Sequence, residues 1–110
     1  MLILAVECSA TPASCAIIDN GKIRACSFVN AKLTHSQTLV QAIINMLDNS
    51  ATKLCDIDSI AVAVGPGSFT GLRIGISAVK GLAAPQNMPC MPVSTLDGIA
   101  ESYSDRNCIV

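Results

Sequence analysis

A glycine-rich turn between an apolar strand and a helix constrains the fold of this chain more than any other feature. It lies within residues 58–84, which read DSIAVAVGPGSFTGLRIGISAVKGLAA. The β-branched apolar run at 60–64 is typical of a strand covered on both faces. Gly65 and Gly67 allow a second backbone or an anion to approach closely, because they carry no Cβ atom. Ser68 is a natural N-cap, and the N–H groups of the helix that it starts would face whatever lies above the turn.

The spacing of these glycines matches neither of the common phosphate-binding loops. A Walker loop requires G-x-x-x-x-G-K-[ST], and no glycine in this chain is followed by Lys-Ser or Lys-Thr. The dinucleotide fingerprint G-x-G-x-x-G fits Gly65 and Gly67, but the next glycine, Gly71, comes one residue too late. From spacing alone we favour a tight strand-to-helix turn whose glycines satisfy geometry over a phosphate site.

Periodicity and turn residues predict an alternation of strands and helices. Asn20-Gly21 is a strong hairpin signal, and Thr34 with Gln37 forms a capping box that opens the first helix. Ser94 caps a last helix, with Asp97 in its first turn. The order β-β-β-α-β-α-β-α is that of an α/β fold in two or three layers, an antiparallel meander followed by right-handed crossovers. We expect strands at 2–8, 13–19, 22–29, 60–64 and 90–93, and helices at 34–47, at 71–84 and after Ser94.

The two central helices carry more apolar and small residues than one buried face requires. The helix at 34–47 is apolar nearly all round, although a surface helix needs an apolar face of only about 100°. The helix at 71–84 has two neighbouring rows of small residues, which let another helix approach closely. The first row is Gly71, Gly75 and Ala78, and the second is Ser77, Gly81 and Ala84. We predict a partner interface on these helices, with Leu39, Val40, Ile43, Ile44, Gly71, Gly75 and Ala78 as its residues.

The composition is that of one domain with more apolar residues than its own core needs. The chain has 110 residues, of which 51% are hydrophobic and 14% charged, and its mean hydropathy is +0.53. No apolar run approaches the ~20 residues that span a bilayer, so we expect no membrane contact and an apolar surface for a protein partner. A net charge of −1 and only three aromatic residues argue against direct tRNA binding.

The N-terminus is apolar but does not have the features of a secretory signal. Glu7 stands directly before Cys8, and no Lys or Arg precedes Lys22, whereas a signal needs a basic region and small residues before the cleavage point. We therefore expect residues 2–8 to form a strand and the chain to be cytoplasmic.

The cysteines and the single histidine do not form a metal-binding or catalytic pattern. The six cysteines contain no C-x-x-C pair, and we expect reduced thiols in a cytosolic core. Hairpin geometry permits one cross-strand pair, between Cys8 and Cys15. His35 is the only histidine, so we expect no bound metal, and no Ser-His-Asp set is legible.

Four strings of this sequence together resemble one protein family. The string GPGSFTGLRIG at 65–75 is the most specific, and LILAVECSATPASCAIIDNGKI at 2–23 looks like the family's first hairpin. THSQ at 34–37 and PVSTL at 92–96 also lie where the family has similar strings. The family is TsaB, also called YeaZ, and the resemblance covers nearly the whole chain but only the first half of the family's usual length. It implies a ribonuclease-H-like lobe of the actin/Hsp70/sugar-kinase type with a five-stranded mixed sheet, and a second lobe after Val110.

The resemblance also implies a role in making threonylcarbamoyladenosine on tRNA. TsaB-like proteins pair with a catalytic paralogue, TsaD, and work beside a TsaE-like ATPase, so we expect a non-catalytic scaffold that forms a homodimer in isolation through the same helices. The paralogue binds its metal through two histidines one helical turn apart. Here Leu39 stands one turn after His35, so that site cannot form, and a metallopeptidase activity is poorly supported.

The resemblance leaves a nucleotide-binding alternative open. In nucleotide-binding members of the superfamily, the turn after the first strand carries an acidic residue and small polar residues beside the phosphates. This chain has Glu7-Cys8 where most relatives have Asp-Thr, and we favour Glu7 as a carboxylate satisfied by turn amides. The vestigial nucleotide or anion site would consist of Glu7, Ser9, Gly65, Gly67 and Ser68. We expect no cofactor in this chain, with ATP or ADP binding only in complex with a partner. The alternative function is an ATP-binding enzyme resembling actin or a sugar kinase, which would use Glu7 and the turn from Gly65 to Gly71. An actin-like interaction domain without a tRNA role is a third interpretation.

Overall fold

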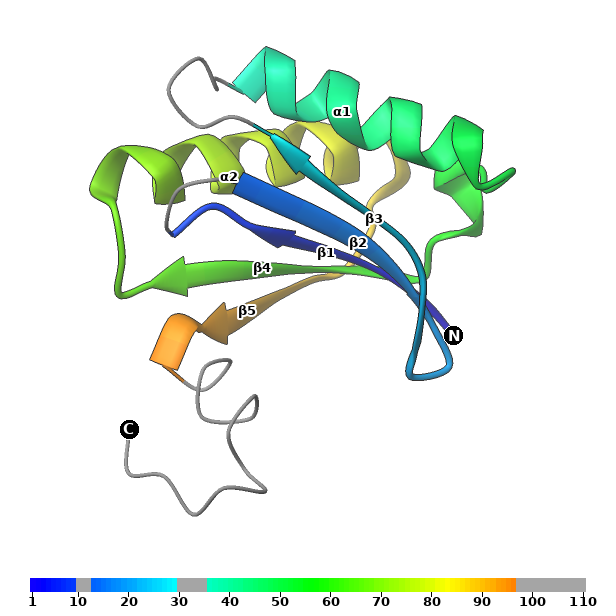
Figure 1. Cartoon of the computed structure of the whole chain (residues 1–110), viewed down its shortest axis with the longest axis horizontal. Coiled ribbons are helices and arrows are strands. Elements are labelled where there is room, and N and C mark those ends of the chain that lie inside the picture. Colours follow the sequence, from blue (N-terminus) through cyan, green and yellow to red (C-terminus); the bar gives the residue numbers. More distant parts are fainter. Residues whose placement is uncertain (10–12, 30–35, 97–110) are drawn as a thin grey trace.

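The protein folds around one five-stranded mixed sheet (Figure 1). The computed structural model describes residues 1–9, 13–29 and 36–96. The strands lie in the order β3-β2-β1-β4-β5, which confirms the predicted five-stranded mixed sheet. Their bounds are β1 (Leu2–Glu7), β2 (Ala13–Asp19), β3 (Lys22–Val29), β4 (Ser59–Gly65) and β5 (Cys90–Ser94).

One half of the sheet is an antiparallel meander and the other half is parallel. β1 pairs with β2 and β2 with β3 in antiparallel register, whereas β4 pairs in parallel with both β1 and β5. Asn20 and Gly21 make the tight turn between β2 and β3, and both have positive φ, 51° and 85°. Two consecutive residues with positive φ are what a hairpin turn of the favoured type requires, which explains why Asn-Gly stands there.

Two helices cover one face of this sheet (Figure 1). α1 (Ser36–Asn49) packs over β3 and β2, α2 (Phe69–Ala83) packs over β4 and β1, and the two helices contact each other. Two short 3₁₀ turns, η2 (Leu54–Asp56) and η3 (Ala84–Gln86), follow the helices. The core fills the space between helices and sheet, and its largest fully buried side chains are Leu4, Ile17, Leu39, Ile43, Ile60 and Val79.

The element bounds agree with the sequence pattern where the structure describes them. α2 begins directly after its predicted cap, Ser68, whose Oγ accepts a hydrogen bond of 3.3 Å from the N–H of Gly71. The capping residue Thr34 lies outside the described residues, and so does the predicted last helix beyond Leu96. Within residues 1–9, 13–29 and 36–96, none of the helices has the length and the apolar character needed to cross a bilayer.

Candidate functional site

The predicted site residues meet at the carboxyl ends of β1 and β4. These strands are parallel neighbours, with Val6 opposite Val62, so the segments that follow them lie at the same edge of the sheet. β1 continues toward β2 on one side and β4 continues through α2 toward β5 on the other. Such a divergence is where open α/β sheets bind ligands. The structure therefore brings Glu7 and Ser9 next to the turn of Gly65, Gly67 and Ser68.

The glycine turn packs directly against the backbone that follows β1. The N–H of Ser68 donates a hydrogen bond of 2.8 Å to the carbonyl oxygen of Ser9. A Cβ added to Gly67 would lie 2.6 Å from that carbonyl oxygen and 2.5 Å from the Cβ of Ser9. A Cβ added to Gly71 would lie 2.1 Å from the carbonyl oxygen of Cys8. Both glycines are therefore required because another stretch of backbone occupies the space of a side chain.

Gly65 is required for a different reason, which is its backbone conformation. Its φ is +126°, a value that residues with a side chain rarely adopt, and the peptide bond between Gly65 and Pro66 is cis. Pro66 ends β4, and the chain then reaches Ser68 and the start of α2.

Glu7 is engaged by its own turn. Its Oε1 accepts a hydrogen bond of 2.6 Å from the N–H of Ser9 and a second one from the Ser9 hydroxyl. Ser9 is buried and Glu7 half-buried. This is the bonding expected for a carboxylate satisfied by turn donors. Among the described residues, no group of three His, Cys, Asp or Glu side chains is arranged to hold a metal ion.

Two buried thiols lie behind this site, between sheet and helices. Cys8 packs against Gly75, where an added Cβ would lie 3.3 Å from its sulfur, and the Sγ of Cys15 lies 3.9 Å from the Sδ of Met46. Both are free thiols. Burial raises the pKa of Cys8 to about 11, and the neighbouring Glu7 and Cys15 add to this effect. Burial also raises the pKa of Cys15 to about 11, with a further contribution from Cys26.

The structure corrects the predicted outward position of most of the interface residues. Leu39 and Ile43 are fully buried, because α1 covers the sheet with the face that carries them. In α2 the row of Gly71, Gly75 and Ala78 also points inward, toward Cys8 and Val6 for the two glycines, and Ala78 is 2% exposed. These residues make close packing possible inside the domain, so they are not available to a partner on this surface.

Other residues of the same helices do face outward. On α1, Ile44 is 38% exposed, and Val40 is partly buried against the core. On α2 the second small row is the outward one, since Ser77 and Gly81 are exposed and a Cβ added to Gly81 would meet no atom within 4 Å. The sequence contained this row, but two small rows on one helix do not indicate which one faces the sheet.

The mixed sheet, the paired helices and the glycine turn define a class, the actin-like α/β lobes. Residues 29–107 match the family model of TsaD, described as tRNA N6-adenosine threonylcarbamoyltransferase, and the chain belongs to this family. The solved structure of YeaZ from Pseudomonas aeruginosa superposes with a TM-score of 0.83 at 31% sequence identity, over 96% of this chain and 49% of that one.

Curated relatives point to the TsaB branch that the sequence strings indicated. The chain is 36% identical over 107 residues to "tRNA threonylcarbamoyladenosine biosynthesis protein TsaB" of Escherichia coli strain K12, which covers 97% of this chain and 46% of the relative. The TsaB protein of Bacillus subtilis strain 168 is 33% identical over 100 residues, covering 91% and 44%. A tRNA N6-adenosine threonylcarbamoyltransferase from Staphylococcus saprophyticus is 32% identical, covering 88% and 33%. The resemblance to TsaB is confirmed, and this chain spans about half the length of the TsaB relatives.

Proposed function

We propose that this chain acts in threonylcarbamoyladenosine biosynthesis as a non-catalytic lobe that pairs with a TsaD-like catalytic paralogue. The role is taken from the TsaB relatives that match nearly the whole chain. The observation that supports a non-catalytic role is that the backbone of Cys8 and Ser9 fills the space above Gly67 and Gly71. A phosphate group would need that space, and it would also compete with the hydrogen bonds that Ser9 donates to Glu7.

The pairing surface in this proposal is the outward side of α1 and α2. It consists of Ile44 with Val40 on α1, and of Ser77 and Gly81 on α2. An apolar residue beside a small row allows the helices of a partner to approach at close distance and bury apolar area. In the absence of the paralogue, two copies of the chain would use the same surface in a two-fold symmetric homodimer.

The binding partners and the cellular location of the protein follow from this role. The complex would contain the TsaD-like paralogue and a TsaE-like ATPase, and this lobe would make no direct contact with tRNA because its net charge is only −1. The free thiols of the chain fit the reducing cytoplasm, where we place it.

The test compares two substitutions at one outward position. Gly81→Leu adds a bulky side chain to the pairing surface, whereas Gly81→Ala adds only a methyl group, and both remove the helix-destabilising glycine. Isothermal titration of the chain into the TsaD-like paralogue of the same organism measures the affinity. We expect Gly81→Leu to weaken pairing by about tenfold or more, a change of about 1.4 kcal/mol, and Gly81→Ala to leave it near the wild-type value.

A second measurement addresses the biological role. Ile44→Asp places a charge on the same surface, so it should weaken pairing and lower the threonylcarbamoyladenosine content of tRNA in cells that rely on this protein. Unchanged affinity in both Gly81→Leu and Ile44→Asp would show that the pairing surface lies elsewhere. A normal threonylcarbamoyladenosine content of tRNA in cells that lack this protein would contradict the proposed role.

A further inference from the structure

A polar crevice lies between α1 and β3. β3 is an edge strand, with β2 on one side and no described strand on the other, and α1 packs over it (Figure 1). The crevice encloses about 370 Å³. Its polar lining consists of Arg24 and Ser27 from β3, Asn45 and Asn49 from α1, and Ser50 directly after α1. Hydrogen-bonding groups from two elements therefore meet in one hollow, which we call the β3 crevice.

The β3 crevice lies on a different side of α1 from the pairing surface. Asn45 and Asn49 follow Val40 and Ile44 of the pairing surface by five positions each. At about 100° per residue this spacing is a rotation of about 140° around the helix axis. An occupant of the crevice therefore leaves the pairing surface free, and its binding does not depend on the proposed function.

The backbone of β3 offers hydrogen bonds beside the crevice. An edge strand has a row of N–H and C=O groups that no strand of the sheet uses, and proteins often protect such a row with basic residues and a β-bulge. These devices stand only at the start of β3, where Lys22 and Arg24 are basic. The pairing with β2 also shifts there, so that Arg24 lies opposite no residue. Residues 25–28 carry no charge, and this part of the edge is open to a further strand.

α1 adds a row of side-chain amides along the same crevice. Gln41, Asn45 and Asn49 are four residues apart, which places them in one row on the helix. The Nε2 of Gln41 donates a hydrogen bond of 3.0 Å to the Oδ1 of Asn45, so the Nδ2 group of Asn45 is a donor. A side-chain amide has a donor and an acceptor, as a peptide group does. The amides and the edge of β3 are therefore complementary to the main chain of an extended peptide.

Arg24 gives the crevice a positive charge at one end. Its Nη1 lies 3.9 Å from the Oδ2 of Asp19, and the two side chains are 42% and 45% exposed. Such an exposed ion pair contributes little, whereas a carboxylate that binds the guanidinium with both oxygens forms a strong contact. Among the described side chains that line the crevice, none is acidic. Charge complementarity therefore favours an occupant with a carboxylate.

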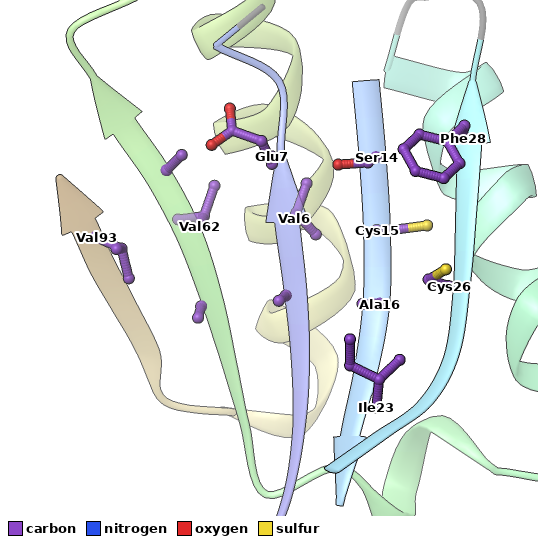
Figure 2. Close-up of a pocket in the computed structure, with 13 residues that line it drawn as sticks. Val6, Glu7, Ser14, Cys15, Ala16, Ile23, Cys26, Phe28, Val62 and Val93 are labelled. Carbon is purple, nitrogen blue, oxygen red and sulfur yellow. The ribbon is translucent and has the colours of Figure 1, made fainter. Parts of the chain in front are cut away.

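The opposite face of β3 is apolar. Ile23 and Phe28 are each 72% exposed. Figure 2 shows them beside a groove on the face of the sheet that points away from α1 and α2. The floor of this groove consists of the alanines at positions 5, 16, 61 and 63. Alternate side chains of a strand added to β3 would point to this apolar face and to the polar crevice.

We propose that the β3 crevice binds an extended peptide segment of a partner protein, which adds a strand to the sheet along β3. The main chain of the segment pairs with residues 25–28 and with the amides of Asn45 and Asn49. An acidic side chain of the segment binds Arg24, and apolar side chains on its other face cover Phe28. The paired part needs only about four residues, or about 13 Å of extended chain.

Selection from a library of random heptapeptides displayed on phage, with the full chain as the target, tests this proposal. We expect enriched peptides that alternate apolar and polar residues, have an acidic residue at a fixed place and lack proline in the paired part. Fluorescence anisotropy of the most enriched peptide, synthesised with a fluorescein label, gives its Kd. In nitrogen-15 NMR spectra the amide signals of residues 25–28 should shift on binding.

Three variants locate the peptide and its charge. Asn49→Leu fills the crevice and should weaken binding by about tenfold or more, because amide hydrogen bonds are lost. Asp48→Leu changes the neighbouring exposed position, which does not line the crevice, and should leave the Kd unchanged. Arg24→Gln should weaken binding by about tenfold and remove the preference for the peptide over its analogue with glutamine in place of the acidic residue. A cooperative urea transition checks that each variant folds.

Several results would overturn the proposal. They are a selection that enriches no sequence, a Kd that Asn49→Leu leaves unchanged, and shifted signals only on the outward side of α1 and α2. Glutarate alone that reproduces the NMR shifts would make the crevice a site for small dicarboxylates. Amide exchange in β3 that slows with rising chain concentration, without any peptide, would make a second copy the occupant. Either result would also contradict a peptide site.

Discussion

At the scale of single residues, the glycines of this chain have opposite roles. A Cβ on Gly71 would lie 2.1 Å from a backbone oxygen, whereas a Cβ on Gly81 of the same helix would meet nothing. Gly71→Ala should therefore lower the free energy of unfolding by about 1–3 kcal/mol or more, since backbone must move. Gly81→Ala should raise it by about 1 kcal/mol through helix propensity. Urea unfolding of both variants measures the two effects, and a stable Gly71→Ala variant would contradict the tight packing.

The two buried thiols predict a pH dependence of stability. Cys8 and Cys15 have folded pKa values of about 11, above the ordinary value of 9.0. Above pH 9 the unfolded thiols lose their protons while the folded ones keep them, so the unfolded state is favoured progressively and stability falls between pH 9 and about 11. Below pH 9 these thiols are neutral in both states and contribute no slope.

Unfolding free energies measured in urea across this alkaline range check the dependence. Cys15→Ala should show a shallower fall than the wild type, while alanine at the exposed Cys55 should keep the wild-type slope. Identical slopes for the two variants would mean that the buried thiol is not responsible.

At the scale of elements, α2 depends on the residue that caps it. The Oγ of Ser68 accepts a hydrogen bond from the N–H of Gly71, and the N–H of Ser68 holds the turn to Ser9. Ser68→Ala removes only the side-chain bond and should cost about 1 kcal/mol, whereas Ser68→Asp keeps an acceptor and should stay near the wild type. Thermal or urea unfolding gives the comparison, and equal losses in both variants would indicate that the cap bond is not the cause.

The elements also show where sequence patterns stop being informative. The hairpin at Asn20-Gly21, the cap at Ser68 and the strand after Asp58 each depend on neighbouring residues, so local patterns predicted them. The orientation of α1 and α2 depends on packing against a sheet whose strands are far apart in the sequence. A helix that is apolar nearly all round, or that has two rows of small residues, does not specify which side is buried.

At the scale of the whole molecule, the edge of the sheet where β1 and β4 end has no room for a phosphate beside the glycine turn, because the backbone of Cys8 and Ser9 packs against Gly71 and Gly67. ATP with magnesium should therefore bind this chain with a Kd above roughly 1 mM, worth only about 4 kcal/mol. Calorimetry measures this value directly. Micromolar binding that is lost in Glu7→Ala would favour the kinase-like or ATPase-like alternative over the scaffold.

The sequence by itself determined the succession of strands and helices from β1 to β5, the strand-to-helix turn and the family, because these depend on local periodicity, caps and an extended string of matching residues. Only the tertiary structure decided that Gly67 and Gly71 pack against the backbone of Ser9 and Cys8. It also decided that Leu39 and Ile43 are buried while Ser77 and Gly81 face outward, and that one face of the sheet is an alanine-floored groove. The reason is physical: burial and close approach depend on which distant segments lie together, and such pairings leave no local period in the sequence.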